Sequence, residues 1–170
     1  MNMKGQYFSF DAIIATVIMV LAFSSLVAYW YGAQAVVESR TYSRLADAER
    51  IAESLLSPGS PANWDSQPIT GIRQIGIAAS FGNELNMTKV NRLKAYASPA
   101  GGNYEAAGNL LRAGGNYYVL IERTDTAGIV AEIGNNGYGN ASYVAVANRG
   151  VTYQDAGGSH PARMRVFLWK

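Results

Sequence analysis

The sequence predicts an α+β fold in which a long N-terminal hydrophobic helix packs on an antiparallel sheet of about four strands. Three observations predict it. The uncharged run Ala12–Val37 continues into a proline-free amphipathic stretch that ends at Leu56. The segment SPGSP, residues 57–61, then breaks the helical pattern, because proline and glycine disfavour a continued helix. Strand-like segments separated by Gly- and Asn-rich turns fill residues 117–169.

The first half of the predicted helix has the length and composition of a membrane span. An apolar run of about 20 residues matches the roughly 30 Å hydrocarbon core of a bilayer, and residues 12–31 form such a run. Tyr29, Trp30 and Tyr31 stand at its far end, where aromatic rings favour the membrane–water interface. Lys4 precedes the run, as expected for a cytoplasmic end, so we expect the residues after the span to lie outside the cell.

The second half of the predicted helix is amphipathic. Apolar residues recur every three or four positions, and charges of alternating sign lie on another face. The apolar positions are Ala33, Val37, Leu45, Ala48, Ala52 and Leu55, and the charged ones are Arg44, Asp47, Arg50 and Glu53. A helix from Tyr7 to Leu56 would be about 75 Å long at 1.5 Å per residue. A plain membrane anchor needs no such continuation, so we expect the stripe from Val37 to Leu56 to cover the apolar face of the sheet.

The rest of the chain predicts two short helices and a sheet. A helical pattern covers residues 85–97, with Asn86 or Thr88 as its cap, and a second covers about 106–113. The predicted strands are Tyr117–Arg123, Gly128–Ile133, Ser142–Tyr153 and Ala162–Trp169. In the last strand, alternation places Met164, Val166 and Leu168 on one face and Arg163, Arg165 and Phe167 on the other. Closely spaced strands favour an antiparallel meander with one buried and one wetted face.

The N-terminal residues MNMKGQYFSFDAIIATVIMV resemble the class III signal of archaeal type IV prepilins. Such signals have a short basic leader, a glycine before the cleavage point, a glutamine after it, and a hydrophobic helix that stays on the mature protein. The resemblance implies cleavage between Gly5 and Gln6 by a membrane prepilin peptidase, leaving 165 residues with a net charge of +1. Short segments further along resemble exported archaeal pilin-like proteins: Pro61, Asn63, Trp64, Ile75, Gly76, Ile77, Ala78, Leu85, Lys89, Val90 and Trp169. Trp64 and Trp169 are interpreted as core residues.

The resemblance implies a domain organisation and a function. Residues 1–5 would be a leader, 6–32 a membrane and filament-core half-helix, 33–56 its amphipathic half, and 57–170 an extracellular α+β domain. The chain would be a major or minor subunit of an archaeal type IV pilus-like filament for adhesion or cell-surface interaction. It would enter the membrane as a precursor, meet the pilus assembly platform, and form a helical homo-oligomer through its N-terminal helix at the cell surface.

Asp11 is the predicted assembly residue. Related pilins carry a carboxylate as the fifth mature residue, whereas here Phe10 is fifth and Asp11 is sixth. A carboxylate at the edge of an apolar run is costly in lipid unless it is paired. We hypothesise that Asp11 pairs with the new α-amino group of Gln6 on a neighbouring subunit and sets the register of assembly.

Two other interpretations of the N-terminal segment remain open. Ala33-Gln34-Ala35 resembles the cleavage site of an ordinary secretory signal, although the apolar run exceeds the usual 7–15 residues. The helix would alternatively tether an exported binding protein that never polymerises. An exported enzyme is a third and more distant alternative.

The remaining composition indicates little chemistry. The chain has no cysteine, and 14 basic against 12 acidic residues give a net charge of +2, too weak to indicate nucleic-acid binding. The single histidine, His160, precedes a proline and is interpreted as a solvated turn residue. We therefore expect no enzymatic activity, no cofactor and no metal. Two N-x-[ST] sequons make Asn86 and Asn140 candidates for N-glycosylation.

Overall fold

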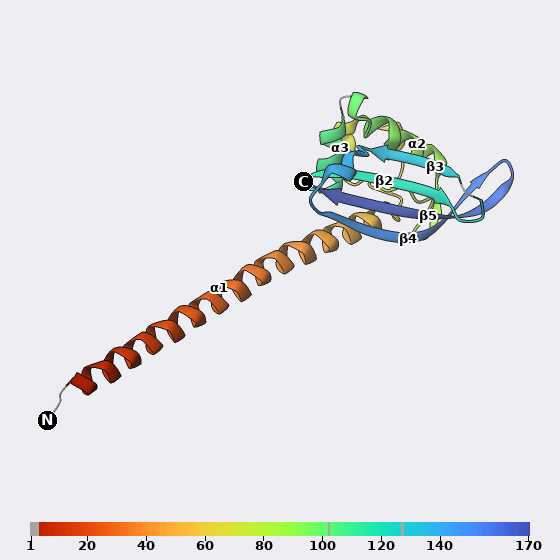
Figure 1. The fold of residues 1–170 in the computed structure, drawn as a ribbon. Helices are drawn as coiled ribbons and strands as arrows, with labels where there is room; N and C mark the ends of the chain where they lie inside the picture. Colours follow the sequence, from red (N-terminus) through yellow and green to blue (C-terminus); the bar gives the residue numbers. More distant parts are fainter. Residues whose placement is uncertain (1–3, 102, 127) are drawn as a thin grey trace. The chain divides into compact units, whose positions relative to one another are not determined.

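The computed structural model describes residues 4–101, 103–126 and 128–170, with side chains from residue 10 onward apart from residue 40 (Figure 1). The chain divides between Tyr42 and Ser43 into two units, which we call the N-terminal unit and the C-terminal unit.

A single helix, α1 (Lys4–Leu55), forms the described part of the N-terminal unit and continues into the C-terminal unit. The predicted helix from Tyr7 to Leu56 is confirmed to within three residues. After its last turn the SPGSP segment changes the backbone direction, with Gly59 at a φ of 81°. The Ser57 hydroxyl donates a hydrogen bond to the Ser54 carbonyl (2.7 Å), which satisfies one of the free carbonyls at the helix end.

The C-terminal unit contains a five-stranded mixed sheet with helices packed against it (Figure 1). Its helices are α2 (Met87–Tyr96) and α3 (Tyr104–Leu111), with 3-10 turns η1 (Trp64–Ser66), η2 (Ile69–Gly71), η3 (Pro99–Gly101) and η4 (Gly137–Asn140). Its strands are β1 (Glu84–Leu85), β2 (Asn116–Arg123), β3 (Ile129–Gly134), β4 (Val144–Asp155) and β5 (Gly158–Trp169). The α+β fold class and the four longer strands are confirmed.

The strand order corrects the predicted meander. The order is β1-β4-β5-β2-β3, so β3 and β4 are consecutive in sequence but not adjacent in the sheet. Strand β5 lies between β2 and β4 in the sheet and pairs with both. This place suits its composition, because apolar residues occupy both of its faces, which is typical of interior strands. The fifth strand, β1, has two residues and runs parallel to β4, so it is too short to produce an alternating pattern.

The hydrophobic core lies between the inner face of the sheet and the helices. Helix α1 contributes Ala48, Ile51, Ala52 and Leu55, all fully buried. Helices α2 and α3 add apolar side chains to the same core, and the sheet adds Met164, Val166, Leu168 and their neighbours. The predicted stripe is therefore confirmed at Ala48, Ala52 and Leu55, whereas Leu45, which is 37% exposed, lies outside the core.

The outer face of the sheet is only partly wetted, contrary to the prediction. Tyr118, Leu120, Phe167 and Trp169 form a second buried cluster there. The connection from β3 to β4 covers it, because Tyr138 of η4 stacks on Phe167 at a ring-centroid distance of 4.7 Å. The arginines of the same face remain more open, and Arg165 pairs with Glu122 at 2.7 Å.

The segment after the helix break is held by buried polar contacts. Trp64 is fully buried, and its indole N–H donates to the Gly76 carbonyl (2.7 Å). Lys89 is 5% exposed, and its ammonium group donates to the carbonyls of Pro58 (2.8 Å) and Ala78 (3.4 Å). These donors satisfy carbonyls of irregular backbone that would otherwise be buried without partners. Trp64 and Trp169 are thus core residues, as predicted.

Candidate functional site

The most prominent surface of the N-terminal unit is apolar. None of residues 10–39 is buried, and the exposed side chains include Phe23, Leu26 and Trp30, each more than 60% exposed. In the described chain, α1 is the one helix long and apolar enough to cross a membrane, with a mean hydropathy of 2.3. An apolar surface of this extent requires lipid or other protein to cover it. The helix therefore suits membrane insertion or a secretion signal.

Two hydroxyl groups in the apolar part of this helix bond to the helix itself. Thr16 donates to the Ala12 carbonyl (2.8 Å) and Ser25 to the Leu21 carbonyl (2.8 Å), each one turn earlier. A hydroxyl that bonds to its own helix exposes no unpaired donor to the surroundings. Tyr29, Trp30 and Tyr31 are all strongly exposed, as a set of interfacial aromatic rings would be.

The predicted processing and assembly residues lie at the start of α1. Gly5 and Gln6 belong to its first turns, and the side chain of Gln6 lies outside the described residues. Asp11 is exposed, and no described residue forms an ion pair or side-chain hydrogen bond with its carboxylate. A charged carboxylate beside an apolar run needs a partner if lipid surrounds it. No described residue supplies such a partner for the Asp11 carboxylate.

The two sequons differ in accessibility. Asn140 is exposed at the end of η4. Asn86 is half-buried and caps α2, where its side-chain oxygen accepts hydrogen bonds from the backbone N–H groups of Thr88 (3.0 Å) and Lys89 (3.3 Å). The predicted cap at Asn86 is confirmed. Because its side chain already stabilises the helix start, Asn86 is the less accessible of the two sequons.

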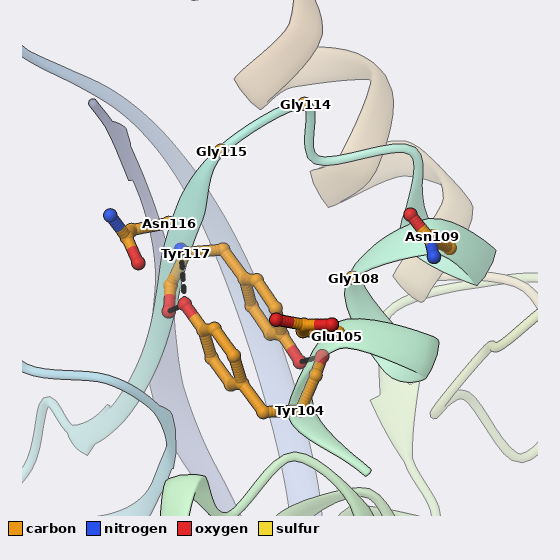
Figure 2. Close-up of a pocket in the computed structure, with 8 residues that line it drawn as sticks. All are labelled: Tyr104, Glu105, Gly108, Asn109, Gly114, Gly115, Asn116 and Tyr117. Atoms are coloured by element: carbon orange, nitrogen blue, oxygen red, sulfur yellow. Dashed lines mark hydrogen bonds between the residues drawn. The ribbon is translucent and has the colours of Figure 1, made fainter.

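A polar cavity of about 390 Å³ opens beside α3 and the start of β2 (Figure 2). The rings of Tyr104 and Tyr117 stack at its base with a centroid distance of 4.6 Å and an interplanar angle of 1°. The Tyr104 hydroxyl accepts a hydrogen bond from the Tyr117 backbone N–H (2.9 Å), and the Tyr117 hydroxyl donates to the Tyr104 carbonyl (3.1 Å). Gly108 makes room for this stack, since a Cβ there would lie 3.0 Å from the Tyr117 ring.

The tyrosines of this cavity are held by hydrogen bonds within the fold. Burial raises the pKa of Tyr117, and it also raises that of Tyr104. Both phenols therefore stay protonated and keep their hydrogen bonds. The remaining polar side chains around the cavity are Glu105, Asn109 and Asn116, which can hydrogen-bond a polar group but include no activated nucleophile (Figure 2).

His160 lies in β5 and not in a solvated turn, which corrects the interpretation from sequence. Its side chain is 19% exposed and lies between two aspartates. The Arg123 guanidinium, which can only donate, lies 2.9 Å from Nδ1, so Nδ1 accepts and the Nε2–H donates to Asp155 (3.0 Å). Sequence reasoning missed this cluster because its members come from the β2–β3 turn and the β4–β5 hairpin.

The carboxylates of this cluster are held in their charged form. Hydrogen bonds from Arg123 hold the pKa of Asp125 well below its usual range. The backbone N–H of Gly157 lowers the pKa of Asp155. The contacts fasten two turns of the sheet to each other. Among the described residues, no group of three or more His, Asp or Glu side chains is arranged to hold a metal ion.

No family model, curated protein or solved structure matches this chain. The architecture itself is pilin-like: a long N-terminal apolar helix whose last turns pack on a mixed, mostly antiparallel sheet.

Proposed function

We propose that this chain is a structural subunit of an archaeal type IV pilus-like surface filament that serves adhesion or cell-surface contact. The precursor would be held in the membrane by α1, cut between Gly5 and Gln6, and passed to a pilus assembly platform. Copies would then associate through their N-terminal helices. This role requires no catalytic chemistry, cofactor or nucleic acid.

One observation carries the proposal. Helix α1 is continuous from Lys4 to Leu55, yet it meets two different environments along its length. Its residues 12–37 are uncharged and unburied, while Ala48, Ile51, Ala52 and Leu55 belong to a folded core. The exposed length matches a bilayer before assembly, and equivalent helices of other copies would cover the same surface afterwards.

Processing tests the first step. We expect N-terminal sequencing and intact mass of the cell-derived protein to give a chain that begins at Gln6. A start at Gln34 or Val36 would support an ordinary secretory signal, and a start at Met1 would support a non-polymerising membrane-anchored binding protein. The same intact mass tests whether the sequons carry glycans, and peptide mass mapping would place them, with modification expected at the exposed Asn140 before the half-buried Asn86.

Asp11→Ala tests the assembly step. The substitution removes the proposed partner of the Gln6 α-amino group on the neighbouring subunit. A charge-assisted hydrogen bond contributes about 1.5–3 kcal/mol, so we expect filament yield to fall by about tenfold or more. Negative-stain microscopy would count filaments, and immunoblotting would confirm that the subunit still reaches the membrane.

Glu38→Ala is the matched control for this experiment. It removes a carboxylate from an exposed position of the same helix, beyond the apolar run. We expect it to leave assembly unchanged. Wild-type filament yield from Asp11→Ala would reject the assigned role of Asp11, and an equal loss from both variants would show a general need for negative charge on α1.

A further inference from the structure

A groove of about 440 Å³ in the C-terminal unit is lined by three arginines from distant parts of the sequence. Arg50 comes from α1, Arg73 from the segment after η2, and Arg112 from the end of α3. Its volume lies within the range of about 300–1,000 Å³ that is typical of small-molecule sites. The groove shares no lining residue with the cavity beside Tyr104 and Tyr117.

The positive charge in this groove is not balanced locally. Glu53 is the carboxylate in the lining, and it pairs with Arg149 at 2.7 Å. Arg50 is partly satisfied, because it donates to the Arg112 carbonyl (2.8 Å) and lies 3.4 Å from Asp47. Among the described residues, none forms a hydrogen bond or ion pair with the side chains of Arg73 and Arg112, and both are exposed.

Arginines elsewhere in the C-terminal unit are mostly neutralised. Carboxylates pair with Arg123, Arg149, Arg163 and Arg165 at 2.7–3.4 Å. A protein that binds nucleic acid needs a continuous basic face to follow the phosphates. Arg73 and Arg112, which have no carboxylate partner among the described residues, instead line the same groove, which favours a compact acidic ligand.

The backbone at Arg112 is strained. Arg112 has φ 55° and ψ 44°, and among the described residues it is the only one other than glycine with a positive φ. Glycine or asparagine usually occupies this position after a helix, because a Cβ is disfavoured in the left-handed region. Strain that is retained at one position is a reason to look for a function of its side chain, and here that side chain lines the groove.

We propose that this groove binds acidic polysaccharides through the carboxylate of a sugar-acid unit. A planar guanidinium can hold a carboxylate with two parallel hydrogen bonds. Leu110 adds aliphatic surface for the C–H face of a sugar ring. The Gln74 amide nitrogen already donates to the Ser54 and Ser57 hydroxyls (3.2 Å each), which leaves its side-chain carbonyl oxygen to accept from a sugar hydroxyl. The proposal names a ligand for the adhesive role that is proposed for the chain. It rests on that proposed function only for its biological purpose.

The test is a binding titration on the full, unpolymerised chain in neutral detergent micelles. The probe is fluorescently labelled tetragalacturonate, and maltotetraose of equal length without carboxylates is the neutral comparison. Low salt is needed, because exposed charges are screened within about 10 Å at 0.1 M. We expect saturable binding of tetragalacturonate and none of maltotetraose. Absence of tetragalacturonate binding, or equal binding of both probes, overturns the proposal, as does equally effective competition by inorganic phosphate.

Arg112→Asn and Arg73→Gln identify the site. Each should weaken binding by about tenfold or more. Asparagine tolerates the left-handed conformation, so Arg112→Asn should bind weakly while its melting temperature stays equal to or above that of the wild type. Arg163→Gln makes the same charge change on the outer face of the sheet and should stay within about twofold of wild-type affinity. An equal loss in Arg163→Gln overturns the assignment of the groove.

The outcome is separable from the filament proposal. Sedimentation of the same variants reports self-association. If the wild type fails to bind tetragalacturonate while the groove variants alter self-association, the groove is a contact between copies and the ligand proposal is wrong. Filament assembly is measured through Asp11, which lies outside the groove, so either proposal can fail without the other.

Discussion

Leu55→Ala tests whether the last turns of α1 are part of the folded core of the C-terminal unit. Leu55 is fully buried, and its carbonyl accepts a hydrogen bond from the Ile77 backbone N–H (2.8 Å). That bond ties the helix end to a second buried segment and limits how far the site can collapse around a smaller side chain. Leu26, on the same helix, is 62% exposed and provides a matched position.

The expected magnitude follows from the buried volume. Loss of three buried carbons costs roughly 2.4 kcal/mol at about 0.8 kcal/mol each. The cavity left behind raises the total to about 3–4 kcal/mol, within the range for Leu→Ala in cores. At about 3–5 °C per kcal/mol for a domain of this size, the melting temperature of the C-terminal unit should fall by about 10 °C or more. Leu26→Ala should change it by less than about 2 °C.

Thermal unfolding of the full chain in detergent micelles, followed by tryptophan fluorescence, measures this difference. Trp64 and Trp169 are buried in the C-terminal unit, whereas Trp30 is already exposed, so the signal change reports that unit. Equal shifts for Leu55→Ala and Leu26→Ala would refute the reasoning. So would a shift of less than about 2 °C for Leu55→Ala, because the helix would then not contribute to the core.

Two further predictions concern the loops and the acid stability of the C-terminal unit. Gly76→Ala should destabilise the unit by about 3 kcal/mol or more, because a Cβ there would lie 2.1 Å from the Ser57 carbonyl oxygen. The control Gly139→Ala meets no atom within 4 Å and should be near neutral. Chemical denaturation compares the two variants, and equal unfolding midpoints would contradict the expectation. Asp125 and Asp155 have lowered pKa values in the fold, so the unfolded chain binds more protons as the pH falls below about 4 and stability is lost there. The double variant Asp125→Asn/Asp155→Asn should show a flatter decline in melting temperature from pH 6 to pH 2, and a decline as steep as that of the wild type would disprove the link.

Local patterns in the sequence were enough to predict much of the fold. Helix α1, the cap at Asn86 and the four longer strands follow from apolar runs, capping residues and alternation, which act over a few positions. The inner face of β5 was likewise readable from its alternating residues. The proposed roles of Gln6 and Asp11 were also inferred from the sequence, because they depend on which residues stand at the start of the helix.

Long-range pairing was decided only in the tertiary structure. Strand β1 exists because Glu84 and Leu85 meet β4, and two residues carry no periodic signal of their own. The outer face of the sheet is partly buried because the β3–β4 connection brings Tyr138 over Phe167. His160 changed from a solvated turn residue to part of a charged cluster for the same reason, since its partners belong to other turns.

The apolar helix is thus a property of the sequence alone, because hydrophobicity and periodicity are local. The buried part of that helix begins at Ala48, and the sheet that packs against it sets this boundary. The groove of Arg50, Arg73 and Arg112 was decided in the same way. Charges distant in sequence can be recognised as one site only after the chain has folded and brought them together.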